Sequence, residues 1–171
     1  DAALWSVIFS LIVIFLYILI RFKKWQFSLG AVVAVFHDVL LVLSIFSIFY
    51  GIMPFSLEIN QAFIAAILTI IGYSLNDTVV VFDRVREYME NYKKKEVHEI
   101  INNALNSTLS RTINTSLTTF VVLSVIFMFG GESIKGFMFA LMVGVVVGTY
   151  SSLFVASPVM VDTIKRKAIK E

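Results

Sequence analysis

The composition of this 171-residue chain is that of a helical membrane protein. Hydrophobic residues make up 58% of it, charged residues 15%, and the mean hydropathy is +0.88, whereas a soluble domain carries about a quarter charged residues. Long apolar runs rich in phenylalanine favour helices over a barrel of alternating strands. The absence of cysteine excludes disulfides and thiolate chemistry. The net charge of +2 is small and by itself says nothing about nucleic acid, and we expect no nucleic-acid partner.

Five apolar stretches predict five membrane-spanning helices in an all-α bundle. These spans lie at about residues 3–20, 28–50, 61–82, 110–129 and 136–161. The intervening segment 83–109 is charged at first and then amphipathic, which favours a position at the cytoplasmic surface. The whole chain, residues 1–171, is therefore predicted to be a single transmembrane domain.

The loops differ sharply in their content of lysine and arginine. In chain order they carry three (21–27), none (51–60), five (83–99), one (130–135) and four (162–171). Because basic loops stay in the cytoplasm, this alternation predicts an external N-terminus and a cytoplasmic C-terminus. The chain starts at Asp1 without the pattern of a signal peptide, so we expect it to be a piece of a longer protein.

Asp77 and Arg111 are charged residues inside apolar stretches. Asp77 lies six residues before the charged segment that begins at Asp83, which is ~9 Å along a helix. A carboxylate at the bilayer centre costs roughly 2.5–3.5 kcal/mol, so it rarely lies there without a partner or a function. Arg111 begins the fourth span, at a similar expected depth. The two residues either form a static ion pair or belong to a functional site.

Polar and small residues form a stripe along each of these two helices. In the third span the stripe comprises Ala65, Thr69, Gly72, Tyr73, Asn76 and Val80, with Asp77 at its edge, and in the fourth it comprises Ser107, Arg111, Asn114, Thr115 and Thr118. Because lipid would penalise either stripe, we expect the two to face each other inside the bundle.

The fifth span carries a small residue at every fourth position. The series is Gly136, Ala140, Gly144, Gly148, Ser152 and Ala156. Small residues are common in membrane helices, but six in register indicate a ridge against which another helix packs closely.

His37 and Asp38 lie near the middle of the second span. Adjacent residues are about 100° apart on a helix, so they make a poor joint metal site. We interpret Asp38 as a second intramembrane carboxylate and His37 as an interior histidine or its hydrogen-bond partner. Because the sequence also shows no phosphate-binding loop and no nucleophile–base layout, we predict no metal, no cofactor and no enzymatic activity.

Two motifs carry a family resemblance. The stretches GYSLNDTVVVFDRVRE (72–87) and LSRTINTSLTT (109–119), with His37-Asp38 before them and a glycine-rich last span, resemble the SecF family of protein-export subunits. The resemblance covers about residues 28–167 and implies half of a pseudo-symmetric bundle of the resistance-nodulation-division superfamily. It also implies that this chain corresponds to spans two to six of SecF, after a first span and a periplasmic domain.

The resemblance further implies a function and partners. SecF works with SecD, separate or fused, beside the SecYEG translocon in the bacterial inner membrane, and uses the proton motive force to promote export of preproteins. Asp77 would accept the proton, with Arg111 near but not permanently paired and Thr115 in the polar path. Asp38, His37, Asn76 and Asn114 would be auxiliary residues. Two alternatives stay open: a proton-coupled small-solute transporter of the same superfamily, and a passive translocon scaffold.

Overall fold

Long helices make up almost all of the chain that the structure describes. The computed structural model describes residues 2–92 and 95–168, with the side chains of residues 5, 9–92 and 95–164. Over this part the elements are α1 (Ala2–Phe22), α2 (Trp25–Phe49), α3 (Gln61–Asn91), α4 (Val97–Phe129), α5 (Glu132–Ser151), a π-helical turn η1 (Ser152–Ala156) and α6 (Ser157–Ala168). The all-helical fold class predicted from the sequence is confirmed.

Four continuous helical stretches are long and apolar enough to cross a membrane. Among the described residues they are Trp25–Phe49, Gln61–Asn91, Val97–Phe129 and Glu132–Ile164, and Phe9–Phe22 of α1 forms a shorter apolar helix. Segment 83–109 consists of the ends of α3 and α4 around a short turn. Ion pairs one turn apart, Arg84–Glu87 and Arg86–Glu90, support the polar end of α3.

Two bends between helices have clear local causes. Lys23 adopts φ 56°, a left-handed conformation, and its amide bonds to the carbonyl of Leu19 at 2.8 Å, which ends α1. Asn60 caps α3, because its side chain accepts a hydrogen bond from the Phe63 amide at 3.1 Å. These residues let successive helices run back along one another.

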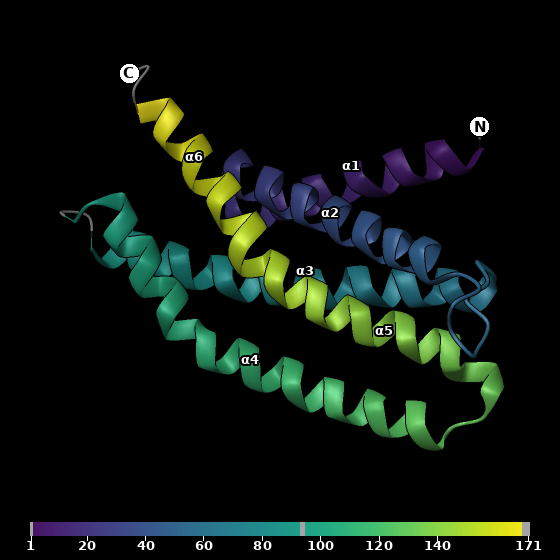
Figure 1. The fold of residues 1–171 in the computed structure, drawn as a ribbon. Helices are drawn as coiled ribbons and strands as arrows, with labels where there is room; N and C mark the ends of the chain where they lie inside the picture. The colour runs from purple at the N-terminus through teal and green to yellow at the C-terminus, as the bar shows by residue number, and fades with distance from the viewer. Residues whose placement is uncertain (1, 93–94, 169–171) are drawn as a thin grey trace.

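The helices pack with α3 and α5 in the middle. Figure 1 shows α1 and α2 on one side of this pair and α4 on the other, with α6 continuing from α5 towards the C-terminus. The α5 helix contacts α2, α3 and α4, and α1 contacts α2. The middle pair therefore contacts both α2 and α4, and α3 also reaches α1 through the Phe22–Phe82 ring contact and the Arg21–Asp83 ion pair.

Two apolar clusters fill the bundle at different levels along the helices. One cluster includes Phe22, Phe27 and Phe82, whose ring centroids lie 5.1 to 5.9 Å apart. The other includes Phe46 and Phe63, with centroids 4.5 Å apart. Aromatic side chains bury large areas, so each cluster holds its end of the bundle together.

The last helical stretch changes its winding just before Pro158. Proline lacks an amide hydrogen, and its ring clashes with the carbonyl four residues earlier, so an unbroken α-helix is unfavourable here. The π-helical turn η1 lies at this point, and the Ser157 hydroxyl donates to the Ser152 carbonyl at 3.1 Å. The α2 helix approaches closely: a Cβ on Gly30 would meet the Ala156 carbonyl oxygen at 2.5 Å.

Candidate functional site

A layer of buried polar side chains separates the two apolar clusters. On α2, α3 and the α5–η1 stretch, its residues fall in sequence between the members of one cluster and those of the other. The layer comprises Asp38, Ser74, Thr78, Thr108, Thr112, Ser116, Ser151 and Ser152, each at most 9% exposed. We call this set, together with Asp77, the polar layer. Buried polar groups cost free energy unless they are hydrogen-bonded, so their partners decide what the layer can do.

Asp77 lies in this layer between α3 and α4. Its Oδ1 accepts a hydrogen bond from the Thr112 hydroxyl at 3.0 Å. Its Oδ2 is buried and accepts no hydrogen bond from the side chains that the structure describes. The Ser152 hydroxyl of η1 lies near this carboxyl group but donates to the Gly148 carbonyl, at 2.8 Å. A buried carboxyl oxygen without a donor is a site that a proton can fill.

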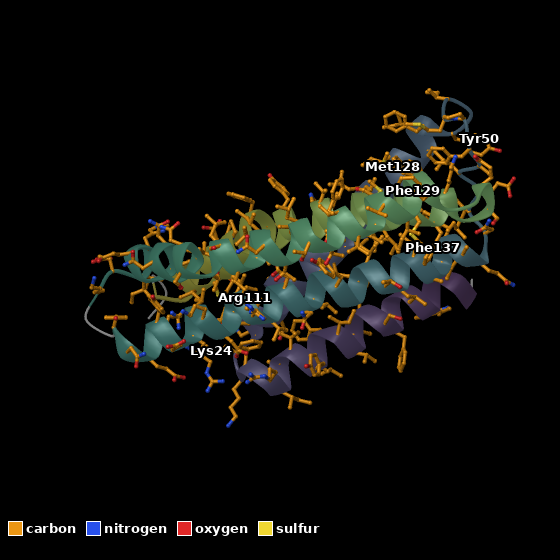
Figure 2. The ribbon with its side chains drawn as sticks, turned by 90° about the horizontal axis from the view of Figure 1, so that it is seen from below. Lys24, Tyr50, Arg111, Met128, Phe129 and Phe137 are labelled. Atoms are coloured by element: carbon orange, nitrogen blue, oxygen red, sulfur yellow. The ribbon has the colours of Figure 1, made fainter. Side chains whose placement is uncertain are left out.

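Arg111 lies close to Asp77 without binding it. It acts on the Asp77 carboxylate electrostatically, but none of the ion pairs among the described side chains joins the two. Figure 2 shows Arg111 along α4, well away from Met128 and Phe129 at the end of that helix. Its side chain is exposed in this chain. The role of Arg111 beside a proton-binding Asp77 stays a prediction.

The prediction that two polar stripes face each other inside the chain is wrong. Residues 69, 72 and 76 of α3 and residues 111, 114, 115 and 118 of α4 are all exposed. The buried face of α4 is instead the one that carries Thr112 and Ser116. One residue corresponds to about 100° of helix rotation, so α4 turns Arg111 and Asn114 outward while Thr112 reaches Asp77.

Thr115 and Asn76 do not contact the Asp77 carboxyl group. The Thr115 hydroxyl donates to the Arg111 carbonyl at 2.9 Å within its own helix. Asn76 lies on the exposed face of α3. Tyr73, from the predicted α3 stripe, does reach α4, where its hydroxyl donates to Ser116 at 3.3 Å.

Asp38 forms a second polar cluster in the same layer. It is fully buried, and its Oδ2 accepts hydrogen bonds from Ser74 at 2.5 Å and Ser151 at 2.8 Å. Its Oδ1 lies 3.1 Å from Nδ1 of His37, whose side chain is 31% exposed. Asp38 thus joins α2, α3 and α5, and His37 is its hydrogen-bond partner.

The small residues of α5 lie against α3. A Cβ on Gly144 would clash with the side chain of Ile70, and one on Gly148 would come 3.1 Å from Cβ of Ser74. Ala140 and Ser152 of the same series are fully buried, and a Cβ on Gly136 would clash with the backbone of Ser56. The close approach at Gly148 brings Ser151 and Ser152 to the level of Ser74.

A hollow of about 310 Å³ leads to Arg111 from the end of the α3–α4 hairpin. It is lined by Val80, Asp83, Arg84, Glu87, Ser107, Thr108 and Arg111. Most of these side chains are polar or charged, so water can enter the hollow. The polar ends of the two helices thus line a hollow that reaches Arg111.

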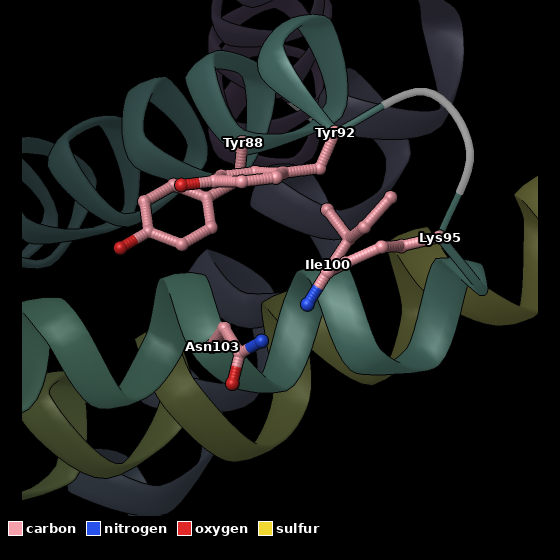
Figure 3. A pocket seen from close by; sticks show the side chains of 5 residues that line it. All are labelled: Tyr88, Tyr92, Lys95, Ile100 and Asn103. Carbon is pink, nitrogen blue, oxygen red and sulfur yellow. The ribbon is translucent and has the colours of Figure 1, made fainter.

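A second hollow, of about 320 Å³, lies at the turn of the same hairpin. Figure 3 shows Tyr88 and Tyr92 on one side of it and Lys95, Ile100 and Asn103 on the other. The hydrogen bond with Glu99 raises the pKa of the Lys95 ammonium, so Lys95 stays charged and paired. This hollow contains none of the residues of the polar layer.

Several residues of the layer were not predicted from the sequence. Ser74, Thr112 and Ser151 donate directly to the two buried carboxyl groups, and Thr78 lies 3.0 Å from Ser152 between the hydroxyl oxygens. Ser74 and Thr78 are four residues apart on α3, on the face that also holds Asp77. That spacing is the one sequence signal that points to them. The described residues contain no group of three metal-ligating side chains.

The fold and the polar layer define a class of protein: a multi-span helical membrane protein with carboxyl groups inside the bundle. Residues 1–166 match a family described as "Protein export membrane protein SecD/SecF, C-terminal". The chain belongs to the SecD/SecF family, and its similarity to SecF subunits places it on the SecF branch.

The relatives support this membership over almost the whole chain. The protein translocase subunit SecF of Rhodothermus marinus is 61% identical over 168 residues, which is 98% of this chain and 54% of that protein. The SecF of Petrotoga mobilis is 46% identical over 165 residues, 96% of this chain and 52% of that protein. The chain therefore spans about half the length of these relatives.

A solved structure shows the same fold. The chain is similar to a crystal structure of SecDF in a super-membrane-facing form, with a TM-score of 0.88 and 39% sequence identity. The similarity covers 98% of this chain and 22% of that one. The helical bundle thus matches about a fifth of that solved SecDF chain.

Proposed function

We propose that this chain is the membrane-embedded part of a SecF-type translocase subunit that couples proton movement to protein export. In this proposal it pairs with a SecD-type half in the bacterial inner membrane and acts beside the SecYEG channel on exported preproteins. Its N-terminus lies on the periplasmic side and its C-terminus in the cytoplasm. The names of the relatives support the export role, and the geometry of Asp77 supports the coupling to protons.

The observation that carries the proposal is the buried Oδ2 of Asp77. Thr112 supplies a donor to Oδ1, but Oδ2 has none among the described side chains. Both oxygens of an ionised carboxylate are hydrogen-bond acceptors that need donors when they are buried, whereas a protonated carboxyl group supplies its own O–H donor. Asp77 therefore has an oxygen that suits a proton that arrives and leaves.

Arg111 supports proton binding at Asp77 because it does not form an ion pair with that carboxylate. An intimate ion pair would hold Asp77 in the charged form, because an opposite charge within a few ångströms favours ionisation. Arg111 acts on the carboxylate without such a pair. It can compensate the charge when the proton leaves and does not prevent the proton from binding.

The hollow beside Arg111 gives the proton a route to one side of the membrane. Its polar lining runs from Glu87, near the end of α3, to Arg111. The exposed polar residues of α3 and α4, Asn76, Asn114 and Thr115 among them, form the face on which we place the SecD-type partner. Covered in that way, they would escape lipid and line the rest of the path.

The energy available is sufficient for a shift in helix packing. One proton that crosses 100 mV releases roughly 2.3 kcal/mol, and such an amount changes the ratio of two conformations more than tenfold. A conformational change needs a differential interaction with the two states. The Asp77 charge, present in one state and absent in the other, supplies it.

The test is Asp77→Asn in the full-length protein with its partner subunit. The amide is nearly isosteric, so the protein should accumulate normally, but it can neither take up nor release a proton. Export that depends on the proton gradient should fall to the level of cells without the protein. Translocation powered by ATP alone, in membranes without a gradient, should not change.

Arg111→Met should also impair export. If Asp77→Asn exports normally at matched protein levels, the coupling is wrong and the passive scaffold gains support. Efflux of small solutes that is lost in Asp77→Asn, with export intact, would instead support the transporter.

A further inference from the structure

Asp38 is a buried titratable group that the proposed proton site does not use. It is 0% exposed, and both of its oxygens have polar partners: Ser74 and Ser151 at Oδ2 and His37 at Oδ1. Apolar side chains would hold these three helices together at a lower cost in free energy, since burial of a carboxylate is unfavourable even with good partners. The site therefore calls for a function beyond packing.

The two carboxyl groups differ in the number of donors they receive. Two serine hydroxyls point at Oδ2 of Asp38, at 2.5 and 2.8 Å. No described side chain donates to Oδ2 of Asp77. A serine hydroxyl has a single proton to donate, and hydrogen bonds to a charged acceptor are the short, strong ones. This distribution fits a charge on Asp38 and a proton on Asp77.

The hydroxyls around Asp38 lie next to those around Asp77. Ser74 lies one turn before Asp77 on α3, and Ser151 precedes Ser152, whose hydroxyl lies near Asp77 and 3.0 Å from the Thr78 hydroxyl. The π-helical turn begins at Ser152, and both serines are fully buried. The serine hydroxyls that donate to Asp38 therefore lie in the same layer as the Asp77 carboxyl group.

We propose that Asp38 is a second proton-binding site and that Asp38 and Asp77 share one proton through the hydroxyls of the polar layer. This inference rests on the proposed role of Asp77 and extends it. With the proton on Asp77, Ser74 and Ser151 donate to ionised Asp38. With the proton on Asp38, that group donates its own O–H, and the released serine hydroxyls reorient to support ionised Asp77. One proton moves, and the net charge of the pair stays at minus one.

His37 gives Asp38 a connection outside the layer. Its Nδ1 lies 3.1 Å from Oδ1 of Asp38, and about a third of its side chain is exposed. His37 thus links buried Asp38 to the exposed surface of the described chain. The ring also lies beside Tyr150 of α5, with centroids 6.4 Å apart.

The other ionisable groups on the elements around α2 are engaged or exposed. Arg21 of α1 pairs with Asp83 of α3, Asp162 of α6 and Tyr17 of α1 are exposed, and Tyr73 of α3 bonds to Ser116. Among the described side chains, His37 is thus the ionisable group in direct contact with Asp38.

The test is an infrared titration of the full-length protein with its partner subunit in liposomes. The carbonyl stretching bands of protonated aspartic acids, assigned with isotope-labelled aspartate, are followed against pH. Two carboxyl groups that share a proton titrate in two separate steps. Asp38→Asn and Asp77→Asn should each leave one step. The control Asp162→Asn, which alters an exposed carboxylate, should keep both.

A second pair of variants tests the hydroxyls. Ser74→Ala and Ser151→Ala keep both carboxyl groups but remove donors, so the two steps should move closer together. They also serve if Asp38→Asn does not accumulate. A spectrum that Asp38→Asn leaves unchanged would show that Asp38 never binds a proton and is only an acceptor for two serines. A separation that neither serine variant alters would refute sharing through the hydroxyls.

The infrared result and the export result are independent. If Asp77→Asn exports normally, the proposed function fails, yet the titration still decides whether Asp38 binds a proton. If Asp77→Asn stalls export and Asp38 shows no step, only the second site is refuted.

Discussion

Thr112 donates to Asp77 at 3.0 Å, although Arg111, one residue earlier on α4, is the charged candidate for that contact. A neutral hydroxyl holds the carboxyl group in place without fixing its charge. Arg111 remains free to act from a greater distance. This division of roles between adjacent residues leads to the first prediction.

Thr112→Val should impair export while the protein accumulates. Valine has the shape of threonine but no donor, so Oδ1 of Asp77 becomes unsatisfied, at a cost of about 1–3 kcal/mol. Export at matched protein levels and the thermal stability of the purified protein both measure the effect. Thr119→Val is the control, because the Thr119 hydroxyl bonds only to the Thr115 carbonyl within α4. Equal effects of the two variants would contradict the role of Thr112.

Gly144→Ala should destabilise the bundle by about 1–3 kcal/mol, because the added methyl group overpacks the contact of α5 with Ile70. Ile70→Ala in the same protein should restore part of the loss, since it removes the side chain that the methyl group strikes. Thermal unfolding in detergent gives both numbers. Val146→Leu, at a residue that is 56% exposed, should change stability little. Without any rescue in the double variant, the close contact is not the cause.

Pro158→Ala should abolish export without loss of stability. Alanine restores the missing amide hydrogen, so η1 can return to a regular α-helix and turn Ser151 and Ser152 away from their partners. A proline inside a helix costs about 3 kcal/mol, so the melting temperature should hold or rise. Pro54→Ala, at the other proline of the chain and in a loop, is the control. Full export by Pro158→Ala would show that the π-helical turn has no role.

Cysteines at exposed residues near the ends of the helices should report the orientation in the membrane. Substitutions at Ser56 and Glu132 should react with an impermeant thiol reagent added to the periplasmic side, and one at Glu96 should not. The alternation of basic loops gives this expectation, and the absence of native cysteine removes background labelling. The opposite labelling pattern would reverse the topology.

The helices were predictable because hydropathy fixes where a chain can cross lipid. Which face of α4 is exposed was not predictable. A sequence defines which residues share a helix face, but not which face the neighbouring helices cover. The sequence pattern indicated that Arg111 and Asn114 face the interior of the bundle, whereas the structure buries Thr112 there. The buried serines were missed for a related reason. Hydroxyls in membrane helices usually bond to their own backbone, as Thr69 does to Ala65 at 2.8 Å.

The end of α3 shows a limit of another kind. Hydropathy placed the end of the third span near residue 82, but the helix continues to Asn91. Beyond the apolar run, local ion pairs such as Arg86–Glu90 support the helix in place of lipid. The motif at residues 72–87 therefore lies entirely within helix α3 and does not run into a loop.

The polar layer lies far from the loops, so a small tilt of a helix at the layer moves the distant end of that helix by a larger distance. From Ser151 to Glu132, α5 extends ~28 Å at 1.5 Å per residue. A tilt of about 5° at the level of Ser151 would move the far end by ~2.5 Å on that length. Hydrogen bonds that rearrange over less than an ångström in the middle of the bundle would then reach the turn at Gly131 as a displacement several times larger.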